Sequence, residues 1–275
     1  MKTKTTLDDR ISQSNLRVYQ DRRSVEYWSS YSDQLLTAER AILVQIRDEL
    51  QDKAILDVGV GGGRTTPHLL EISSNYVGID FAPAMVAVCQ QRFPGVSFIH
   101  CAAREMATLG RETFGLVFFS FNGIDYVNHD DRQKIYAAAR DVLAPGGYCL
   151  FSSHNLRDDR ERLAKPWQFG LQDWRAAASS PRELMRALYH MAKQNLTYMR
   201  LRHAQVHGSK FSILLDRGQR FRNLTYYIDP VEQVRQLEAN GFGDVKVYDR
   251  GGLACAADAS SLDRTNPVHY LARKC

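Results

Sequence analysis

Two carboxylates bracket a glycine-rich segment of this sequence. Asp57 stands two positions before the first of three alternating glycines, Gly59, Gly61 and Gly63, and Asp80 follows Gly59 by 21 positions. Glycines in such a row allow the backbone to turn tightly and to approach a ligand closely. An acid at this distance beyond the turn is suited to accept hydrogen bonds from two ribose hydroxyls. The residue types and their spacing therefore predict a nucleoside site.

The elements that must position these groups are a strand, a loop and a helix. The apolar run Ala54–Val58 predicts a buried parallel strand that ends at the first glycine. Thr66 and Pro67 then predict a helix start, with threonine as N-cap and proline at the first helical position. A second strand, Tyr76–Asp80, carries the second carboxylate. Backbone N–H groups at the start of such a helix face whatever occupies the loop.

The pattern differs from that of nicotinamide-dependent dehydrogenases. Their fingerprint needs a glycine three residues after Gly61, where Arg64 stands, and it asks for no carboxylate at Asp57. The arrangement Asp57-x-Gly59-x-Gly61-x-Gly63, followed by Gly78-Ile79-Asp80, resembles instead the class I S-adenosylmethionine-dependent methyltransferases. The turn Leu143-Ala144-Pro145-Gly146-Gly147 is a further feature that this family shares.

The resemblance implies S-adenosyl-L-methionine as the cofactor. In the family the loop glycines approach the methionyl part and the first acid helps to hold its ammonium group, which assigns that role to Asp57, while Asp80 takes the ribose. The residues assigned to cofactor binding are Asp57, Gly59, Gly61, Gly63, Arg64, Asp80, Phe81, Met85, Ala103 and Arg104. Many relatives carry an acid after the third strand, here Val96–Cys101, that receives the adenine amino group. Ala102 stands in its place, so backbone groups, Arg104 or Glu105 must recognise adenine.

Polar residues follow two later predicted strands. Phe114–Phe121 leads into Asn122-Gly123-Ile124-Asp125-Tyr126, and Tyr148–Ser152 leads into Ser153-His154-Asn155. Ligands in doubly wound sheets lie outside the carboxyl ends of the strands, so both stretches face the predicted crevice. If the acceptor must lose a proton, His154 is the first candidate for the general base, with Asp125 and Tyr126 behind it. A helix-capping turn and a structural histidine are the alternative interpretations. A sulfonium methyl is already activated, so no metal is called for.

Six residues are candidates for contacts with the acceptor. Asn122 and Asn155 follow strand ends, and Tyr226-Tyr227 matches the region where small-molecule methyltransferases commonly line the acceptor pocket. An aromatic cluster near the N-terminus either packs against the core or covers the cofactor as a lid. The acceptor-side set is Tyr27, Tyr31, Asn122, Asn155, Tyr226 and Tyr227.

The order of elements predicts an α/β fold with a doubly wound, Rossmann-like sheet of seven strands. The last strand, Val268–Arg273, is expected to be antiparallel. We expect a single methyltransferase domain over residues 1–275. Its parts are an N-terminal helical lid (1–50), a cofactor-binding core (51–155), an α+β cap insertion (156–228) and a C-terminal completion of the sheet (229–275). Within the insertion, Ser180-Pro181 starts a helix, and Ser209–Leu215 with Phe221–Ile228 forms a hairpin.

The composition is that of an ordinary globular protein, with 44% apolar and 24% charged residues among 275. No apolar run approaches the roughly 20 residues of a membrane span, and the polar N-terminus has no signal-peptide segment, so a cytoplasmic location is expected. Five scattered cysteines are expected to be reduced thiols. The net charge of +5 hides a basic insertion, in which residues 156–225 carry fourteen Lys and Arg against six acids. That surface is interpreted as a solvated cap, or else as a face for an acidic substrate or nucleic acid.

The leading functional hypothesis is methyl transfer to an N or O atom of a small-molecule acceptor. One alternative is a peptide or RNA methyltransferase that uses the basic insertion, and another is a non-catalytic nucleoside-binding protein of the same fold. A dehydrogenase comes last. No membrane partner is expected, nucleic acid is not favoured, and the protein is expected to be a monomer or a homodimer.

Overall fold

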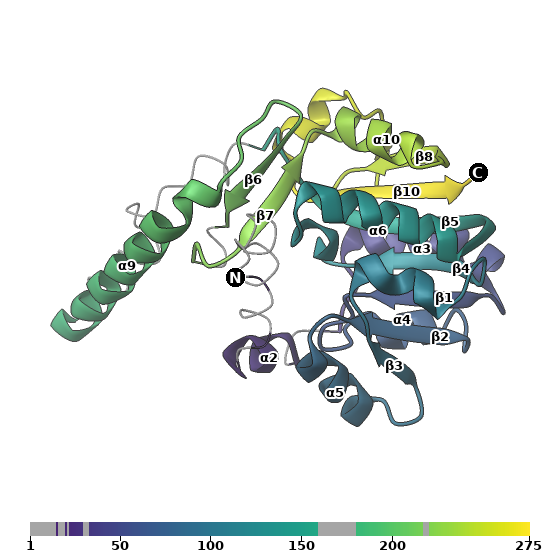
Figure 1. Ribbon diagram of the computed structural model, residues 1–275, viewed down its shortest axis with the longest axis horizontal. Helices are drawn as coiled ribbons and strands as arrows, with labels where there is room; N and C mark the ends of the chain where they lie inside the picture. The colour runs from purple at the N-terminus through teal and green to yellow at the C-terminus, as the bar shows by residue number, and fades with distance from the viewer. Residues whose placement is uncertain (1–14, 16–19, 21, 30–32, 159–179, 217–219) are drawn as a thin grey trace, which may run out of the picture.

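A mixed β-sheet runs through the centre of the molecule, whose computed structural model describes residues 15, 20, 22–29, 33–158, 180–216 and 220–275 (Figure 1). The strand order is β3-β2-β1-β4-β5-β10-β8-β9. The strands are β1 (Ala54–Val58), β2 (Tyr76–Asp80), β3 (Ser97–His100), β4 (Phe114–Phe119), β5 (Leu143–Asn155), β8 (Phe242–Tyr248), β9 (Ala254–Cys255) and β10 (Val268–Lys274). The first five pair in parallel, whereas β10 is antiparallel to both β5 and β8. The predicted seven-stranded sheet with an antiparallel last strand is confirmed, and two-residue β9 extends its edge.

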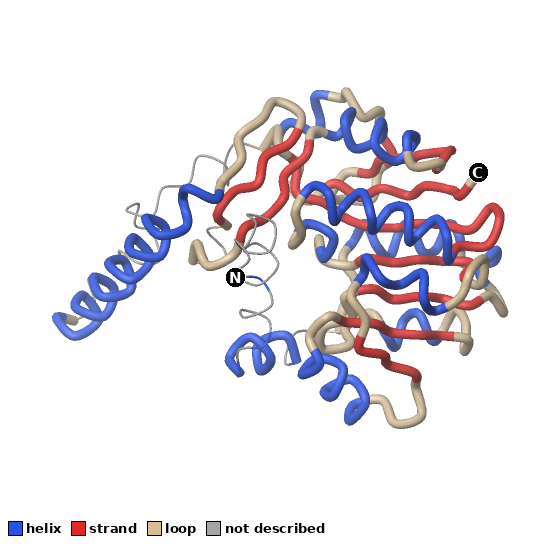
Figure 2. The backbone as a smooth tube through the Cα atoms, viewed as in Figure 1, coloured by secondary structure: helices blue, strands red, loops and turns tan. Residues whose placement is uncertain are grey.

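Helices cover both faces of the sheet (Figure 2). They are α3 (Thr37–Ile46), α4 (Thr66–Leu70) and α5 (Pro83–Arg92), whose apolar residues share one cluster, and α6 (His129–Val142) and α10 (Pro230–Ala239), which share another. Because both faces are covered, every residue of β1 and β4 is buried. That burial explains why their sequences are apolar runs and not alternating patterns.

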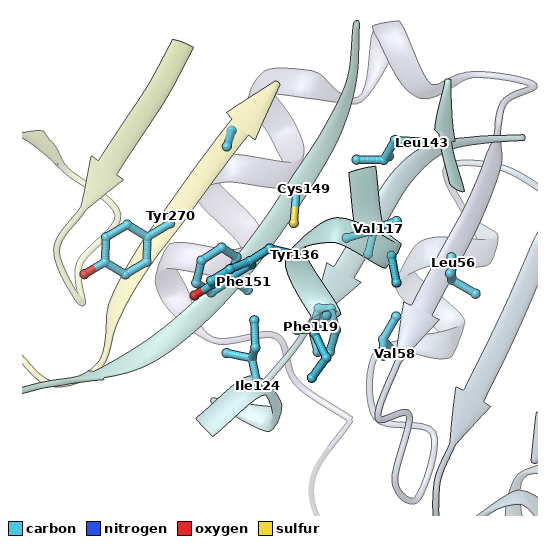
Figure 3. Close-up of a cluster of buried hydrophobic side chains, with 14 of the residues drawn as sticks. Leu56, Val58, Val117, Phe119, Ile124, Tyr136, Leu143, Cys149, Phe151 and Tyr270 are labelled. Atoms are coloured by element: carbon cyan, nitrogen blue, oxygen red, sulfur yellow. The ribbon is translucent and has the colours of Figure 1, made fainter. Parts of the chain in front are cut away.

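The larger core cluster lies between β1, β4, β5 and α6 (Figure 3). Its labelled members are Leu56, Val58, Val117, Phe119, Ile124, Tyr136, Leu143, Cys149, Phe151 and Tyr270. Burying each large apolar side chain contributes about 1.5–3 kcal/mol relative to an exposed one, before conformational entropy is subtracted. This packing fixes the C-terminal ends of β1 and β4, from which the loops of the site emerge.

The short helix α4 differs from the prediction at its start. The helix begins at Thr66 with Thr65 in the capping position, and no side chain caps it. The hydroxyl of Thr65 donates instead to Asp57 Oδ2 at 2.5 Å. The predicted N-cap, Thr66, therefore lies one residue after the observed one. Thr65 occupies the N-cap position without capping the helix, because its hydroxyl is bound to Asp57.

The insertion forms a long helix and a hairpin. Helix α9 (Pro181–Leu201) begins at Ser180, whose Oγ accepts from the backbone N–H of Glu183 at 3.2 Å. Strands β6 (Phe211–Leu215) and β7 (Leu224–Ile228) pair antiparallel, which confirms the predicted hairpin. Strand β7 also pairs in parallel with the end of β5, and in this pairing Tyr227 lies opposite His154. Helix α9 extends away from the sheet (Figure 1).

The N-terminal part includes helix α2 (Arg22–Ser29). Its Trp28 ring meets Phe121 edge-on at 5.4 Å. The candidate acceptor residue Tyr31 lies outside the described residues. Within the described part of the chain, no helix is long and apolar enough to cross a membrane.

Candidate active site

The loop after β1 leaves open space in front of its first glycines. Gly59 and Gly61 have φ angles of +70° and +55°, which only glycine adopts without strain. A Cβ atom on Gly59 would meet nothing within 4 Å, and one on Gly61 would meet only a backbone oxygen at 4.0 Å. Both residues line the main cleft of the protein. The room beside this backbone is available to a ligand.

Gly63 needs to be glycine for another reason. Its φ is +82°, and a Cβ atom there would lie 2.5 Å from Cε2 of Phe93, beyond the end of α5. Gly63 therefore serves packing of the loop and does not line the cleft.

Asp80, at the end of β2, clasps the loop. Its Oδ2 accepts from the N–H of Gly61 at 2.9 Å and its Oδ1 accepts from the N–H of Ala82 at 2.8 Å. Burial raises the pKa of Asp80 to about 6, although these backbone hydrogen bonds lower it. Each carboxylate oxygen can accept a second hydrogen bond, and the residue lines the cleft. Asp80 is therefore placed to hold two hydroxyl groups of a ligand.

The cleft lies at the C-terminal ends of β1 to β4 and contains about 1050 Å³ of space including its open mouth. One wall is apolar and suits a flat aromatic base; it consists of Phe81, Met85, Ala102, Ala103 and Ile135. Two charged side chains, Arg104 and Asp131, stand beside that wall. The arrangement fits a nucleoside whose ribose is held by Asp80.

Comparisons with known proteins identify this arrangement. A family model described as a methyltransferase domain matches residues 55–147, which run from β1 to the turn within β5. Residues 55–147, about a third of the chain, thus resemble a methyltransferase domain, which supports the predicted class I S-adenosylmethionine-dependent methyltransferase. The match contains the glycine loop, Asp80 and the apolar wall of the cleft.

Similar proteins share the methyltransferase core at low sequence identity. An uncharacterised methyltransferase of Oceanobacillus iheyensis is 26% identical over 110 residues, covering 40% of this chain and 50% of that protein. The ubiquinone biosynthesis O-methyltransferase of Hydrogenovibrio crunogenus is 29% identical over 112 residues, covering 38% and 44%. The chain thus spans about half the length of the curated relatives it matches. The 1,6-didemethyltoxoflavin N1-methyltransferase of Burkholderia thailandensis has a TM-score of 0.54 at 15% identity, covering 96% of this chain and 87% of that one, which shows the fold.

Asp57 of the methyltransferase supports the loop without lining the cleft. Its Oδ2 accepts from Thr65 Oγ1 and from the Tyr76 hydroxyl, the latter at 2.9 Å. Its Oδ1 is buried and has no hydrogen-bond partner. An unpaired buried carboxylate oxygen behind a loop with space in front of it fits a site that gains a donor on binding. Contact of Asp57 with the cofactor's ammonium group stays a prediction.

Arg64 fastens the loop to its surroundings. Its guanidinium donates to both carboxylate oxygens of Glu39 at 2.9 Å and to the backbone oxygen of Gln34 at 2.7 Å, and it also contacts Ser120. The side chain is buried. Arg64, predicted as a cofactor contact, therefore positions the loop through α3 and the end of β4.

His154 and Asp125 are hydrogen-bonded to each other. The sequence indicates each of them as a candidate but does not show that they pair. Asp125, in the turn after β4, accepts at Oδ2 from the backbone N–H of His154 at 2.6 Å, and the same oxygen lies 2.7 Å from the ring Nδ1. Asn122 lies 3.3 Å from the other ring nitrogen, Nε2. His154 is not among the residues that line the cleft; Phe121 and Gly123, on either side of Asn122, are. Tyr126 lines it too.

A buried arginine backs this pair. Arg132 donates to Asp125 Oδ1 at 2.5 Å and to Ser153 Oγ at 3.0 Å, and its side chain is fully buried, as is that of Asp125. Burial lowers the pKa of Arg132, but Tyr136 and Asp125 raise it by more, so the guanidinium stays charged. Asp125 thus pairs with Arg132 through Oδ1 and holds the backbone and ring of His154 through Oδ2, which fixes the orientation of the His154 ring.

Three predicted acceptor residues do not face the cleft. Tyr27 is 55% exposed, and its neighbour Trp28 lines the cleft instead. Asn155 is buried and donates to the backbone oxygens of Leu262 and Thr265 at 2.6 and 2.9 Å, so it anchors the segment before β10. Tyr226 is also buried, with its hydroxyl 2.7 Å from His129 Nδ1. Tertiary packing thus gives Asn155 and Tyr226 structural partners, and contacts of all three residues with an acceptor stay predictions.

Tyr227, the sixth residue of the set, packs its ring 5.0 Å from that of His154. Asn15 and Asp131 are among the cleft residues for which the sequence indicates no role, whereas Trp28 belongs to the aromatic cluster predicted either to pack on the core or to form a lid. Asn15 donates to the backbone oxygens of Tyr126 and Leu224, which are 111 and 209 positions away. A local sequence pattern cannot predict contacts between residues so far apart in the chain. Phe121 and Asn122 adopt left-handed φ angles of 52° and 58°, and such strain is common at functional sites.

Asp57→Asn should stabilise the unliganded methyltransferase near pH 7. Burial raises the pKa of Asp57 to about 6 from 3.8, despite the hydrogen bonds from Thr65 and Tyr76. The folded state therefore holds this proton more tightly than the unfolded state, and the stability it contributes is lost as the pH rises through about 6. A shift of about 2 units corresponds to about 3 kcal/mol. An amide cannot ionise, although its Nδ2 replaces the unpartnered oxygen, so we expect a gain of about 1–2 kcal/mol at pH 7.

Urea unfolding of the unliganded protein at several pH values measures this gain. The advantage of Asp57→Asn should shrink steadily as the pH falls towards 4. The exposed Asp48, changed to Asn, serves as control and should leave the unfolding free energy unchanged at every pH. A variant that is less stable than the wild type throughout the range would show that the ionised carboxylate is needed by the fold.

Proposed function

We propose that this protein transfers the methyl group of S-adenosyl-L-methionine to a nitrogen or oxygen atom of a small-molecule acceptor. The observation that carries the proposal is a single cleft lined both by the clasped loop, Gly61 and Asp80, and by Asn15, Trp28 and Tyr126. The first group suits the cofactor and the second leaves room for an acceptor beside it. The match to a methyltransferase domain supports the cofactor.

The walls of the cleft favour a small acceptor. Trp28 comes from the N-terminal helix and packs against Phe121 across the mouth of the site, and Asn15 bridges the turn after β4 to strand β7 of the insertion. The N-terminal part of the chain thus borders the cleft together with the methyltransferase core, as expected for an enclosed ligand. The structurally similar toxoflavin-pathway protein is an N1-methyltransferase, and the partly matching ubiquinone enzyme is an O-methyltransferase.

The chemistry asks mainly for positioning. Bound S-adenosylmethionine supplies an activated methyl group on its sulfonium sulfur. Asp80 and the loop hold the ribose and methionyl parts, and a closed, dry cleft aligns the acceptor, which can lower a barrier by roughly 7–11 kcal/mol in favourable systems. Asp125 accepts from His154 Nδ1, so the neutral ring carries its lone pair on Nε2, which lies 3.3 Å from the Asn122 amide nitrogen; an acceptor group would replace Asn122 there. We assign to His154 Nε2 the removal of a proton from a hydroxyl or ammonium acceptor.

Adenine recognition is assigned to Asp131. This acid stands at the first turn of α6 and lines the same cleft as Ala102 and Ala103. It can therefore take the place of the carboxylate that many relatives carry after the third strand and that this chain lacks. Asn128 caps the same turn, with its Oδ1 accepting from the N–H of Asp131 at 2.7 Å. The cap fixes the backbone that carries the carboxylate, and an ionised acid at a helix N-terminus is favoured by the helix dipole.

Asp131→Ala should weaken S-adenosylhomocysteine binding about tenfold, the loss expected for one charge-assisted hydrogen bond. Titration calorimetry measures the affinity. The neighbouring exposed Asp130, changed to Ala, removes the same charge from the same turn and should change the affinity little. A ligand with hypoxanthine in place of adenine lacks the amino donor. The wild type should discriminate against it and Asp131→Ala should not; equal discrimination by both would refute the role.

Transfer of a labelled methyl group tests the proposed function. The protein is incubated with S-adenosylmethionine labelled in its methyl carbon and with a metabolite extract, and small-molecule, RNA and protein fractions are counted separately. Label in the small-molecule fraction supports the proposal. Label in RNA or protein would favour the alternative enzyme, whose binding should weaken steeply with salt in the case of RNA. Tight S-adenosylhomocysteine binding without any transfer would indicate a nucleoside-binding protein.

A further inference from the structure

Helix α9 presents an apolar face to solvent. Although it is 21 residues long, none of its residues is buried. Six of its large apolar side chains are 39–67% exposed: Leu184, Met185, Leu188, Tyr189, Leu196 and Met199. At 100° per residue these six positions fall within an arc of about 140° on one side of the helix. Contiguous apolar surface of this kind marks an interaction site.

Basic residues flank that face. Arg182, Arg186, Lys193 and Arg200 recur at i, i+4, i+11 and i+18, which places them in one row beside Tyr189 and Leu196. Glu183 is the only acid of the helix, and it lies 3.8 Å from Arg186. Four cations against one acid give α9 a charge of about +3 when His190 is neutral. The other three cations have no ion-pair partner among the described residues.

The helix is attached to the body mainly by its C-terminal end. Tyr198 meets Phe221 edge-on at 5.5 Å, and Tyr198 and Leu201 pack against the cluster of β6 and β7. From there α9 extends away from the sheet like an arm (Figure 1). An arm with one exposed side can lie along a flat surface without a clash from the rest of the molecule. No residue of α9 lines the cleft.

We propose that α9 is an interfacial helix that binds the surface of an anionic lipid bilayer. Such a helix lies in the plane of the bilayer surface. Its large apolar side chains insert at the boundary between headgroups and acyl chains, and its cations lie among the anionic headgroups. The charge of α9 complements such a surface. Two α9 helices packed on each other would bring eight cations together against two acids, which disfavours self-association. RNA would pair with the cations but would leave Leu184, Leu188 and Met199 in water.

The proposal differs from the sequence expectation of no membrane partner, which concerned spanning segments. A surface helix needs neither the length nor the uniform apolarity of a span. It also does not depend on the acceptor, because α9 is remote from the residues that line the cleft. Methyl transfer and lipid binding can therefore fail separately.

Cosedimentation of the full chain with vesicles tests the proposal. We expect binding to vesicles of phosphatidylcholine mixed with phosphatidylglycerol, little binding to phosphatidylcholine alone, and weaker binding as salt is added. Met185→Ser with Leu196→Ser should remove most of the binding. Arg182→Gln with Lys193→Gln and Arg200→Gln should weaken it roughly 100-fold, since each cation near the surface is worth about fivefold.

Gln194→Ser with Thr197→Ser, on the polar side of the same helix, is the matched control and should bind vesicles like the wild type. All variants should retain wild-type S-adenosylhomocysteine affinity, which shows that they are folded. Equal binding to neutral and anionic vesicles, or wild-type binding by both test variants, would overturn the proposal. So would a lipid-free dimer that the serine variant dissociates, or an RNA complex in place of a vesicle complex.

Discussion

Asp80→Ala should lower the affinity for S-adenosylhomocysteine by at least about 100-fold, as measured by titration calorimetry. The carboxylate holds the N–H groups of Gly61 and Ala82 and still has acceptor capacity towards the cleft. Removing it loses up to two charge-assisted hydrogen bonds to the ligand, each worth about 1.5–3 kcal/mol. It also releases the loop that shapes the cofactor end of the cleft. The substitution therefore weakens binding in two ways, through the lost ligand contacts and through the loosened loop.

Asp80→Asn separates the two effects of this change. Its amide oxygen can still accept from one backbone N–H, so the loop should stay closer to its place and the loss should be smaller. Asp130→Ala controls for charge, because this exposed acid lies next to the cleft residue Asp131 and does not itself line the cleft. It should leave the affinity within about twofold. If Asp80→Ala bound the ligand as tightly as the wild type, the cleft would not be a nucleoside site.

The affinity should also fall at acidic pH. Burial raises the pKa of Asp80 to about 6, so the carboxylate begins to take up a proton just below neutral pH. A protonated acid has lost its charge and part of its acceptor strength. We therefore expect binding to weaken as the pH falls through about 6, and we expect this dependence to be weaker in Asp80→Asn, in which Asp57 still titrates near the same pH. Calorimetry well above and well below pH 6 would measure it.

The cofactor side of the site could be predicted because its signals are local. An apolar run, alternating glycines and an acid about 20 residues on specify strand, turn and second strand without reference to distant residues. Gly63 illustrates the limit of that reasoning. The pattern includes it as a ligand-facing glycine, whereas its lack of a side chain is required by Phe93, 30 residues later.

The acceptor side could not be predicted in detail because strands alternate their faces. His154 and Asn155 are neighbours on β5, and Tyr226 and Tyr227 are neighbours on β7, so only one residue of each pair can point to a given side. His154 and Tyr227 face each other, while Asn155 and Tyr226 turn to structural partners. Knowing which face is which requires the pairing of β5 with β7, and that pairing joins segments more than 70 residues apart.

Helix α9 shows a third limit. The predicted start at Ser180-Pro181 is confirmed, and the helical spacing of Leu184, Leu188 and Met191 makes the helix amphipathic. Amphipathicity states that one face avoids water, but it does not say whether the core, a partner or a membrane covers that face. The exposure of the helix, and not its sequence period, distinguishes these cases.

His154→Ala should lower kcat at least about 100-fold while the affinity for S-adenosylhomocysteine stays unchanged. General base catalysis typically contributes 10²–10⁴-fold, and His154 is the ring that Asp125 orients at the carboxyl end of β5. Steady-state kinetics measure the loss of kcat, and titration calorimetry measures the affinity for S-adenosylhomocysteine.

His154 is a better test of the pair than Asp125. Asp125→Asn would leave Arg132 buried without its counterion, a loss of about 3–5 kcal/mol in the free energy of unfolding. Lost activity in that variant would then report unfolding as readily as catalysis. His129 supplies the matched control, because it is also a half-buried histidine with one ring nitrogen in a hydrogen bond, 2.7 Å from the Tyr226 hydroxyl, but its partner is not Asp125 and it lies at the start of α6, away from the end of β5. If His129→Ala lost as much turnover as His154→Ala, or if His154→Ala turned over at the wild-type rate, the proton would leave by another route and His154 would be a structural residue.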